Sequence, residues 1–221
     1  MREFQALVQV AVVAAAMTAA ADPATAQTEP PVIRGDVAAS IGWLSANTPS
    51  STVYDDNNWV SSLFGTVSGG WHWTDNIKTE LDFGAGTKVS TYRTDPITID
   101  GRPTYQTTRT TFSRRTLAIG QQYQFFHNVW FHPHLAAGAT VTWERATARG
   151  NPIFFYDPRG ALFAAPGTVE GPRTKVTVRP FVGSGFKAYM TDRAFFRSDI
   201  RMTFRGGLDE VLLRIGFGVD F

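Results

Sequence analysis

Histidine is the residue type in this sequence that could most readily carry chemistry, and three of the four histidines lie in the segment HNVWFHPH. His132 and His134 are two residues apart, so on a strand they share one face, and Glu144 falls on that face as well. Two imidazoles and a carboxylate could bind a metal ion or act as a base with its orienting partner. The segment offers no third ligand at a diagnostic spacing and no nucleophile. We therefore expect His127, His132 and His134 to form hydrogen bonds inside the fold, and we expect no catalytic residue, metal ion or cofactor.

Charged residues form rows that alternate with apolar residues, which is the pattern of strands with one polar and one apolar face. Lys78, Glu80 and Asp82, for example, alternate with Leu81 and Phe83. The polar rows are also rich in glycine, and long side chains that share a narrow interior need glycine opposite them. On a soluble barrel the charged rows would instead face water. We predict an inward polar network that consists of Lys78, Glu80, Asp82, Arg114, Glu144, Arg179, Lys187, Arg197, Asp199, Arg201, Arg214 and Asp220.

The inward rows leave two interpretations of the lumen open. With Lys88 and Arg205 also counted as inward, cations outnumber carboxylates. Charges in a narrow lumen must be paired and hydrogen-bonded, so one interpretation is a salt-bridged plug that fixes the shape of the barrel. The other is a narrow pore that prefers anions.

Eight strands can be drawn along the chain, and their connections alternate in length. Tight polar turns at 74–76, 127–128 and 191–193 alternate with longer loops at 46–57, 93–106 and 148–173. This asymmetry predicts an all-β fold, an eight-stranded antiparallel up-and-down transmembrane β-barrel. Pro133 and Pro180 fall inside drawn strands, so we expect a bulge or a strand end there, or a wrong boundary. The predicted strands are 37–45, 58–73, 77–92, 107–126, 129–146, 174–190, 194–206 and 209–221.

The turn at 191–193 also predicts a register for the strands on either side of it. If the faces are to match, Gly185 lies opposite Asp199 and Gly183 lies opposite Arg201, so that a large residue meets a small one. The same register sets Lys187 opposite Arg197. That pair is tolerable only if carboxylates lie between the two cations.

Aromatic residues gather near the tight turns and in the longest loop. Rings beside the turns would form the girdle at which hydrocarbon meets headgroups, although they could also be packing residues at hairpin ends. The predicted girdle is Trp71, Trp73, Phe125, Trp130 and Phe221. Within the loop 148–173, aromatic side chains would either form a recognition surface or pack on one another. These loop residues are Phe154, Phe155, Tyr156 and Phe163.

The first residues have the features of a secretory signal peptide. Arg2 precedes an apolar stretch from Ala6 to Ala21, and Ala24-Thr25-Ala26 suits a cleavage site, which predicts removal of residues 1–26. A short periplasmic segment, 27–36, and a barrel, 37–221, would follow. The chain has no cysteine, so disulfides are excluded, and no clustered basic patch with interleaved aromatics argues for nucleic acid.

The sequence RIGFGV at 214–219, followed by Phe221, resembles the assembly signal of outer-membrane barrels. With the signal peptide and the eight strands, the chain resembles the small outer-membrane barrels that include the OmpA membrane domain, OmpX and the opacity proteins. The resemblance implies a monomer in the outer membrane of a Gram-negative-type bacterium, in contact with lipid and lipopolysaccharide. It also implies that the barrel-assembly machinery reads Arg214, Gly216, Phe217, Val219 and Phe221.

The function that this resemblance favours is a structural or surface-interaction role, with recognition by the loops and an unknown surface ligand. The alternatives are the narrow anion-preferring pore and, less favoured, an enzyme that modifies lipid A. Lipid A deacylases of this architecture carry a His and a Ser two residues apart near the outer rim. Because no serine stands at that spacing from His127, His132 or His134, we predict that the protein is not an enzyme.

Overall fold

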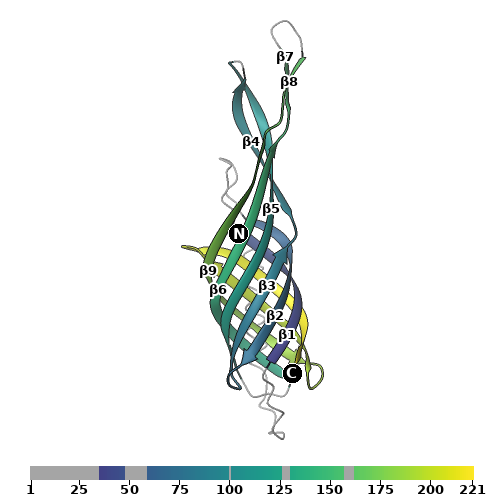
Figure 1. Ribbon diagram of the computed structural model, residues 1–221, viewed down its shortest axis with the longest axis vertical. Helices are drawn as coiled ribbons and strands as arrows, with labels where there is room; N and C mark the ends of the chain where they lie inside the picture. Colours follow the sequence, from purple (N-terminus) through teal and green to yellow (C-terminus); the bar gives the residue numbers. More distant parts are fainter. Residues whose placement is uncertain (1–34, 48–58, 100, 126–129, 157–161) are drawn as a thin grey trace.

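A computed structural model describes residues 35–47, 59–99, 101–125, 130–156 and 162–221 of the 221-residue chain (Figure 1). The predicted signal peptide, nearly all of the segment 27–36 and His127 lie outside the described residues. Within the described ranges there is no helix of the length and apolarity that a membrane span requires. The strands are β1 (Gly35–Asn47), β2 (Trp59–His72), β3 (Ile77–Gly86), β4 (Val89–Ile99), β5 (Arg102–Gln124), β6 (Phe131–Gly150), β7 (Ile153–Tyr156), β8 (Leu162–Ala165), β9 (Val169–Tyr189), β10 (Ala194–Phe204) and β11 (Leu208–Asp220).

Eight strands form a closed antiparallel ring in the order β1, β2, β3, β5, β6, β9, β10 and β11. The ring closes because β11 pairs with β1, from Asp36 opposite Asp220 to Ala46 opposite Glu210. Beyond the last strand pair, Gly35 and Phe221 exchange backbone hydrogen bonds of 3.0 and 2.9 Å. A closed ring leaves no free strand edge in the membrane. The predicted eight-stranded up-and-down barrel is confirmed.

The predicted register around the turn at 191–193 is confirmed as well. Asp199 lies opposite Gly185, Arg201 opposite Gly183, and Arg197 opposite Lys187. A side chain at position 185 would lie 2.4 Å from the backbone oxygen of Ser198. Glycine is therefore required there by the close approach of β10.

Two regions that the sequence predicted as loops are strands instead. The segment 93–106 forms most of β4 and the start of β5, which pair from Val89 opposite Phe112 to Ile99 opposite Arg102. The segment 148–173 contains the end of β6, the hairpin β7–β8 and the start of β9. These strands extend beyond the ring as a narrow projection (Figure 1). We call residues 89–112, 145–156 and 162–175, within the described ranges, the stalk.

Strand length accounts for the stalk. A tilted strand crosses a bilayer in about 9–11 residues, whereas β5, β6 and β9 have 23, 20 and 21 residues. The surplus, at 3.3 Å per residue, corresponds to roughly 30 Å of strand beyond the membrane. β4 continues the pairing of β3 with β5 after a one-residue bulge, because three residues, 86–88, face only Ser113 and Arg114 between the paired positions.

The two prolines lie where the pairing on one side of their strand ends. Pro180 lies just beyond Phe181, the last residue of β9 that pairs with β10. Pro133 lies just before His134, the first residue of β6 in its ladder with β5. Strand edges tolerate a residue that lacks a backbone donor. Pro133 and Pro180 are therefore neither strand ends nor bulges, because they lie within β6 and β9 and only the ladder on one side of each ends there.

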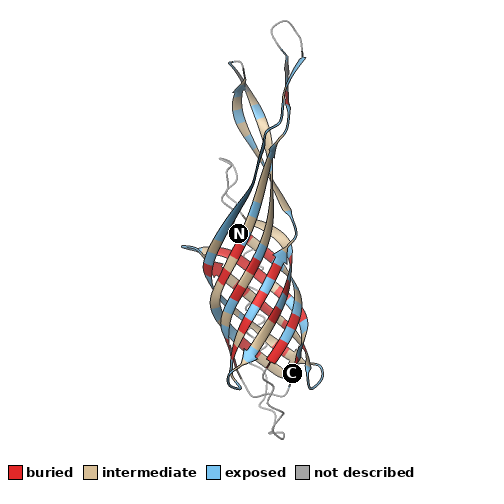
Figure 2. Ribbon diagram, in the orientation of Figure 1, coloured by how far each residue is buried: buried red, intermediate tan, exposed pale blue. Residues whose placement is uncertain are grey.

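The barrel wall separates a polar inside from an apolar outside. Buried residues alternate with exposed or half-buried ones along the strands of the ring (Figure 2), and Lys78, Glu80 and Asp82 are buried while Leu81 and Phe83 are exposed. A row of apolar side chains that faces outward along every strand is the pattern expected for contact with acyl chains.

Glycine at inward positions is a packing requirement that can be tested. A β-carbon at Gly84 would lie 2.2 Å from Cε1 of Phe64 and 2.8 Å from Oγ1 of Thr116, whereas one at Gly65 meets nothing within 4 Å. We expect Gly84→Val to lower the free energy of unfolding by about 1–3 kcal/mol through overpacking. Gly65→Val, on the neighbouring strand, should leave stability unchanged. Urea unfolding in lipid vesicles checks both, and equal midpoints for the two variants would contradict the packing argument.

Candidate functional site

The largest concentration of buried charge lies inside the barrel, in the half next to the short turns. We call it the lumen network. It holds five cations and five carboxylates, and each makes at least one ion pair with another member. The network is therefore formally neutral. Its cations are Lys78, Lys187, Arg197, Arg201 and Arg214, and its carboxylates are Asp36, Glu80, Asp82, Asp199 and Asp220.

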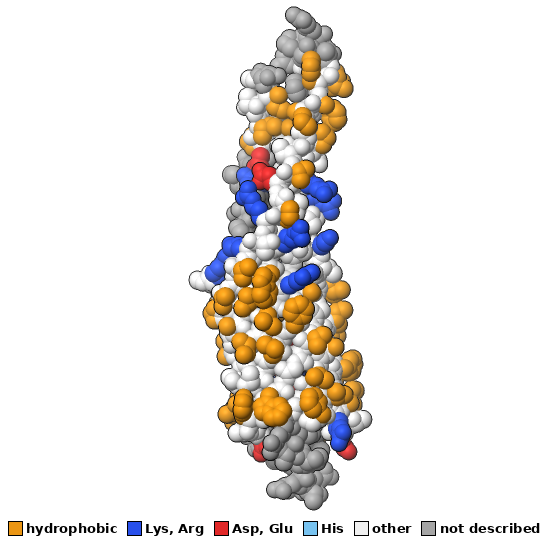
Figure 3. All heavy atoms as spheres, in the orientation of Figure 1, with side chains coloured by type: hydrophobic (Ala, Val, Ile, Leu, Met, Phe, Trp, Pro, Cys, Tyr) orange, Lys and Arg blue, Asp and Glu red, His pale blue; other side chains and the backbone are white. Residues whose placement is uncertain are grey.

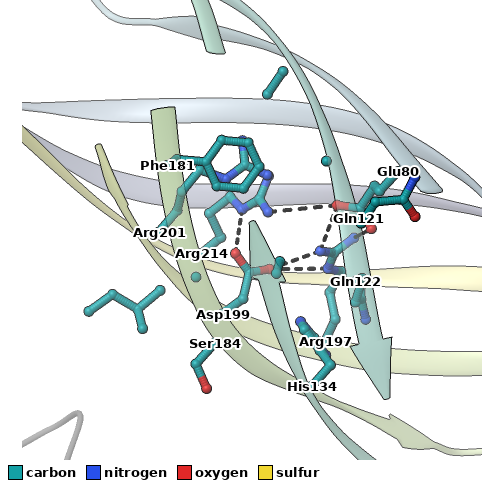
Figure 4. Close-up of a pocket in the computed structure, with 15 residues that line it drawn as sticks. Glu80, Gln121, Gln122, His134, Phe181, Ser184, Arg197, Asp199, Arg201 and Arg214 are labelled. Carbon is teal, nitrogen blue, oxygen red and sulfur yellow. Dashed lines mark hydrogen bonds and ion pairs between the residues drawn. The ribbon is translucent and has the colours of Figure 1, made fainter. Parts of the chain in front are cut away.

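Arginine side chains that bind carboxylates through two guanidinium nitrogens join strands from opposite sides of the ring. Arg197 on β10 donates two hydrogen bonds to Glu80 on β3, of 3.0 and 3.1 Å, and its Nη2 lies 3.0 Å from Asp199 (Figure 4). Arg214 on β11 donates to Asp199 at 2.8 Å and also to Asp82. Because bidentate arginine–carboxylate pairs fix orientation as well as charge, this cross-linking holds the barrel wall in one shape.

Lys187 and Arg197, which the register places opposite each other, each pair with carboxylates, as expected. Lys187 donates to Asp36 and lies 3.3 Å from Asp220, so it points away from Arg197. Lys78 lies 2.9 Å from the same Asp36 oxygen. Asp36 on β1 thus connects lysines from β3 and β9.

A second, smaller charged group lies nearer the stalk and forms its own pairs. Arg114 lies 2.5 Å from Glu144 and 3.0 Å from Glu210, and Arg179 pairs with Glu210 and, at 2.5 Å, with Asp209. These residues come from β5, β6, β9 and β11.

An apolar layer separates the two charged groups. Leu44, Phe64 and Leu212 are buried against one another at the centre of the barrel, with exposed fractions of 4%, 1% and 7%. On β11, Leu212 stands between Arg214 of the lumen network and Glu210 of the second group. An ion that crossed the lumen would have to leave the charged groups and pass this layer.

The observed charge balance differs from the predicted excess of cations. Lys88, which was counted as inward, is exposed between β3 and β4. Arg205 lies at the rim with 45% of its side chain exposed and reaches Asp209 at 3.5 Å. The carboxylates of Asp36, Asp209 and Glu210, which were not predicted, are buried. The described lumen therefore offers no surplus of cations to attract anions.

Two cavities in the described lumen are small. One of about 20 Å³ lies among His134, Phe181, Arg197 and Arg201 (Figure 4), and another of about 30 Å³ lies beside Leu44. A cavity of this size holds one or a few water molecules. The geometry is that of a filled barrel.

The histidines do not form one site. His134 is buried in the lumen network region, and His132 lies at the barrel end with its ring 5.2 Å from that of Tyr189. Glu144 shares their strand, but ten residues of strand correspond to about 33 Å. His72 instead lies 3.5 Å from Asp36. Among the described residues no group of three or more His, Cys, Asp or Glu is arranged to hold a metal ion.

The predicted girdle residues lie around the end of the barrel that carries the short turns. Trp71, Trp73, Trp130 and Phe221 are among the exposed large apolar residues, and Phe125 packs edge-on against Tyr123 at 5.0 Å. A row of rings that was not part of the predicted girdle continues from Trp130. Adjacent centroids in this row are 5.1–6.1 Å apart, and its rings are Phe131, Phe186, Phe196 and Phe217.

The predicted recognition residues lie on the hairpin β7–β8 at the end of the stalk. Phe154, Tyr156 and Leu162 lie in one row, because Phe154 pairs with Ala164 and Tyr156 with Leu162. Their exposed fractions are 64%, 63% and 58%, and Phe163 on the other row is 48% exposed. The backbone of Phe155 pairs with that of Phe163. The apolar patch at the tip is separated from the apolar barrel band by polar stalk (Figure 3).

Comparison with a protein family places the architecture in context. The family described as outer membrane protein beta-barrel domain matches residues 10–221. This range covers every described strand. No curated protein matches the chain.

Several solved structures are similar to this one. Neisserial surface protein A has 14% identity and a TM-score of 0.50 over 85% of this chain and 97% of its own. OprG from Pseudomonas aeruginosa has 13% identity and a TM-score of 0.50 over 86% and 97%. The N-terminal barrel domain of Pseudomonas aeruginosa OprF has 13% identity and a TM-score of 0.48 over 86% and 98%. At such identities the similarity concerns the fold alone.

Proposed function

Since the chain belongs to the outer membrane protein beta-barrel domain family, we propose that it is a non-conducting outer-membrane anchor that holds a recognition hairpin away from the cell surface. The observation that carries this proposal is the stalk, which continues three barrel strands to about twice the length that a membrane requires. A purely structural barrel needs no such extension. A rigid scaffold that presents a binding segment does.

The chemistry of the tip supports a protein or other partly apolar partner. Phe154, Tyr156 and Leu162 expose a row of large side chains to solvent, and contiguous exposed apolar patches mark interaction surfaces. Aromatic anchors contribute much of the energy in such contacts. The neutral, filled lumen supports the anchoring role over the pore, and the separated histidines give no support to a lipid A-modifying enzyme.

The proposal predicts that the tip residues are needed for binding but not for folding. The triple variant Phe154→Ser, Tyr156→Ser, Leu162→Ser should reduce adhesion of expressing cells at least tenfold, since each buried aromatic anchor contributes about 2 kcal/mol or more. Adhesion to immobilised matrix proteins and to cultured animal cells is measured. Heat-modifiable gel migration should stay unchanged.

Tyr92 provides the matched control, because it is 65% exposed but lies near the barrel end of the stalk, opposite Arg109 in the ladder. Tyr92→Ser should adhere like the unmodified protein. The recognition role is wrong if expressing cells adhere no better than cells without the protein, or if the triple variant adheres normally.

We also propose that the last strand carries the assembly signal, in keeping with the RIGFGV pattern. Phe217, Val219 and Phe221 face outward and are exposed, whereas Arg214 and Gly216 face the lumen. A receptor that paired with β11 before barrel closure could contact the exposed row. The inward residues have a second role, since Arg214 belongs to the lumen network and Gly216 packs against β1.

A further inference from the structure

Four exposed arginines lie on the outward face of β5 and β6, and we call Arg109, Arg115, Arg145 and Arg149 the basic strip. Arg149 lies directly opposite Arg109 in the ladder, and Arg145 lies opposite Ser113. Arg115 lies opposite Trp143, and all of these positions belong to the row that faces outward. The strip thus follows the seam between the two strands.

The basic strip begins where the apolar band ends. Along β5 the outward residues Ile119 and Leu117 are followed by Arg115, and along β6 the outward residues Val141 and Trp143 are followed by Arg145. Trp143 is 37% exposed, and tryptophan marks the level at which hydrocarbon meets headgroups. Figure 3 shows Lys and Arg side chains gathered directly above the apolar band. The end of the strip formed by Arg115 and Arg145 therefore lies at the height of the outer-leaflet headgroups, and Arg109 and Arg149 continue it outward along the strands.

The strip has no carboxylate to balance it. Along the described outward rows of β4, β5, β6 and β9 there is no Asp or Glu beside it, because Asp95 and Glu170 belong to the opposite face of the stalk. Arg109 stacks over Tyr92 at 5.9 Å and donates to Ser90 at 3.1 Å. Like charges directly opposite each other, as at Arg109 and Arg149, destabilise a strand pair. An anion from outside the chain would remove this repulsion.

The residues between the arginines are hydroxyl-bearing. Thr111, Ser113 and Thr147 complete the outward row, and Ser90 on β4 lies 3.0 Å from Thr111, hydroxyl to hydroxyl. Arginine forks match phosphate oxygens bidentately, and hydroxyls pair with sugar hydroxyls. The combination suits a phosphorylated sugar whose acyl chains lie against the apolar band below.

We propose that the basic strip is a binding site for the phosphorylated glucosamine headgroup of lipopolysaccharide in the outer leaflet. The occupant follows from three features together: four arginines without balancing carboxylates, hydroxyls between them, and the position at the upper edge of the lipid-facing surface. This site is independent of the recognition hairpin. The triple tip variant should bind lipopolysaccharide like the unmodified protein.

The test uses the folded full chain in detergent and measures its affinity for purified lipopolysaccharide. Arg109→Gln with Arg149→Gln should weaken binding about thirtyfold, since each basic residue near an anionic headgroup surface contributes about a factor of five. Raising the salt concentration should weaken binding to the unmodified protein more than to this variant. Lipopolysaccharide with its phosphates removed should bind the unmodified protein about as weakly as intact lipopolysaccharide binds the variant.

Arg173→Gln with Lys175→Gln is the charge-matched control. These residues lie opposite Ala146 and Glu144 on the other face of the stalk, so their removal should leave affinity unchanged. Without lipopolysaccharide, Arg109→Gln with Arg149→Gln should be at least as resistant to urea as the unmodified protein, because the like-charge pair is gone. Equal loss in both double variants, unchanged binding of the dephosphorylated lipid, or inorganic phosphate that competes at equal concentration would overturn the proposal.

Discussion

Arg214→Met is expected to lower the free energy of unfolding by about 3–5 kcal/mol, because it leaves buried carboxylates without their main partner. Arg214 is 2% exposed and pairs with Asp82 and Asp199, which are 1% and 6% exposed. Arg201 remains 3.5 Å from Asp82, and this longer contact cannot replace the lost one. A loss of this size is a large part of the stability of a typical domain. Urea unfolding in lipid vesicles, followed by tryptophan fluorescence, measures it.

A second, charge-compensating substitution distinguishes the cost of leaving a carboxylate unpaired from the cost of losing arginine side-chain volume. Arg214→Met combined with Asp82→Asn restores neutrality and should recover at least 1 kcal/mol relative to the single variant, since a balanced apolar replacement is better tolerated than a broken pair. Arg93→Met is the exposed control, because Arg93 and Asp95 pair at 2.6 Å with side chains 40% and 36% exposed. Its cost should be below about 1 kcal/mol. A midpoint for Arg214→Met equal to that of Arg93→Met would contradict the structural role of the network.

The barrel could be predicted from the alternation of polar and apolar residues, because the two faces of its wall meet different surroundings. Leu81 and Phe83 face lipid while Glu80 and Asp82 face a cramped lumen, so each strand carries its period in its own residues. The register at Gly185 and Asp199 agrees with the same reasoning, since it keeps the faces matched and sets small residues opposite large ones. Features that depend on the difference between neighbouring residues of one strand, polar against apolar or small against large, could therefore be predicted from the sequence.

The stalk escaped prediction because this contrast disappears outside the membrane. In β4 and the first half of β5 both faces meet water, so Thr94 and Thr107 can pair by their hydroxyls on a face that lies above the lipid. The two faces of such a strand then carry similar residues, so the sequence shows no alternation of polar and apolar residues. One local signal was present, because Asp100-Gly101 between two β-prone runs is typical of a two-residue hairpin turn. Gly101 has the positive φ of 75° that such a turn requires.

The composition of the two charged groups inside the barrel was only partly accessible from the sequence. Glu210 lies in the same inward row as Arg214 and Leu212, so its burial could have been inferred by counting back along β11. Asp36 precedes the predicted first strand by one residue, and the boundary error removed it from the wall. Which carboxylate meets which cation depends on closure of the ring. Asp36 on β1 and Lys187 on β9 are far apart in the chain, and no local pattern links them.

Phe221→Ala is expected to reduce the amount of folded protein in the outer membrane at least tenfold, while folding in vitro into lipid vesicles changes little. Phe221 is 65% exposed, and its ring lies beside Gly35. Its backbone, which alanine keeps, makes the hydrogen bonds that close the ring with Gly35. Removing the ring therefore costs little packing, and a large effect in cells would have to arise during assembly. Membrane fractionation and heat-modifiable gel migration give the two yields.

Gly216→Val provides the contrasting case, because it lies in the same motif but faces inward. A β-carbon there would lie 2.2 Å from Oγ of Ser40 and 2.3 Å from the backbone oxygen of Ala39, so closure between β1 and β11 should fail with or without the assembly machinery. Replacement of a residue of the assembly signal should thus lower the folded yield in cells alone. Replacement of a packing residue should lower it both in cells and in lipid vesicles. If Phe221→Ala folds as poorly in vesicles as Gly216→Val, the aromatic ring acts in the barrel itself and the assembly-signal role is wrong. If both yields of Phe221→Ala are normal, the ring has neither role.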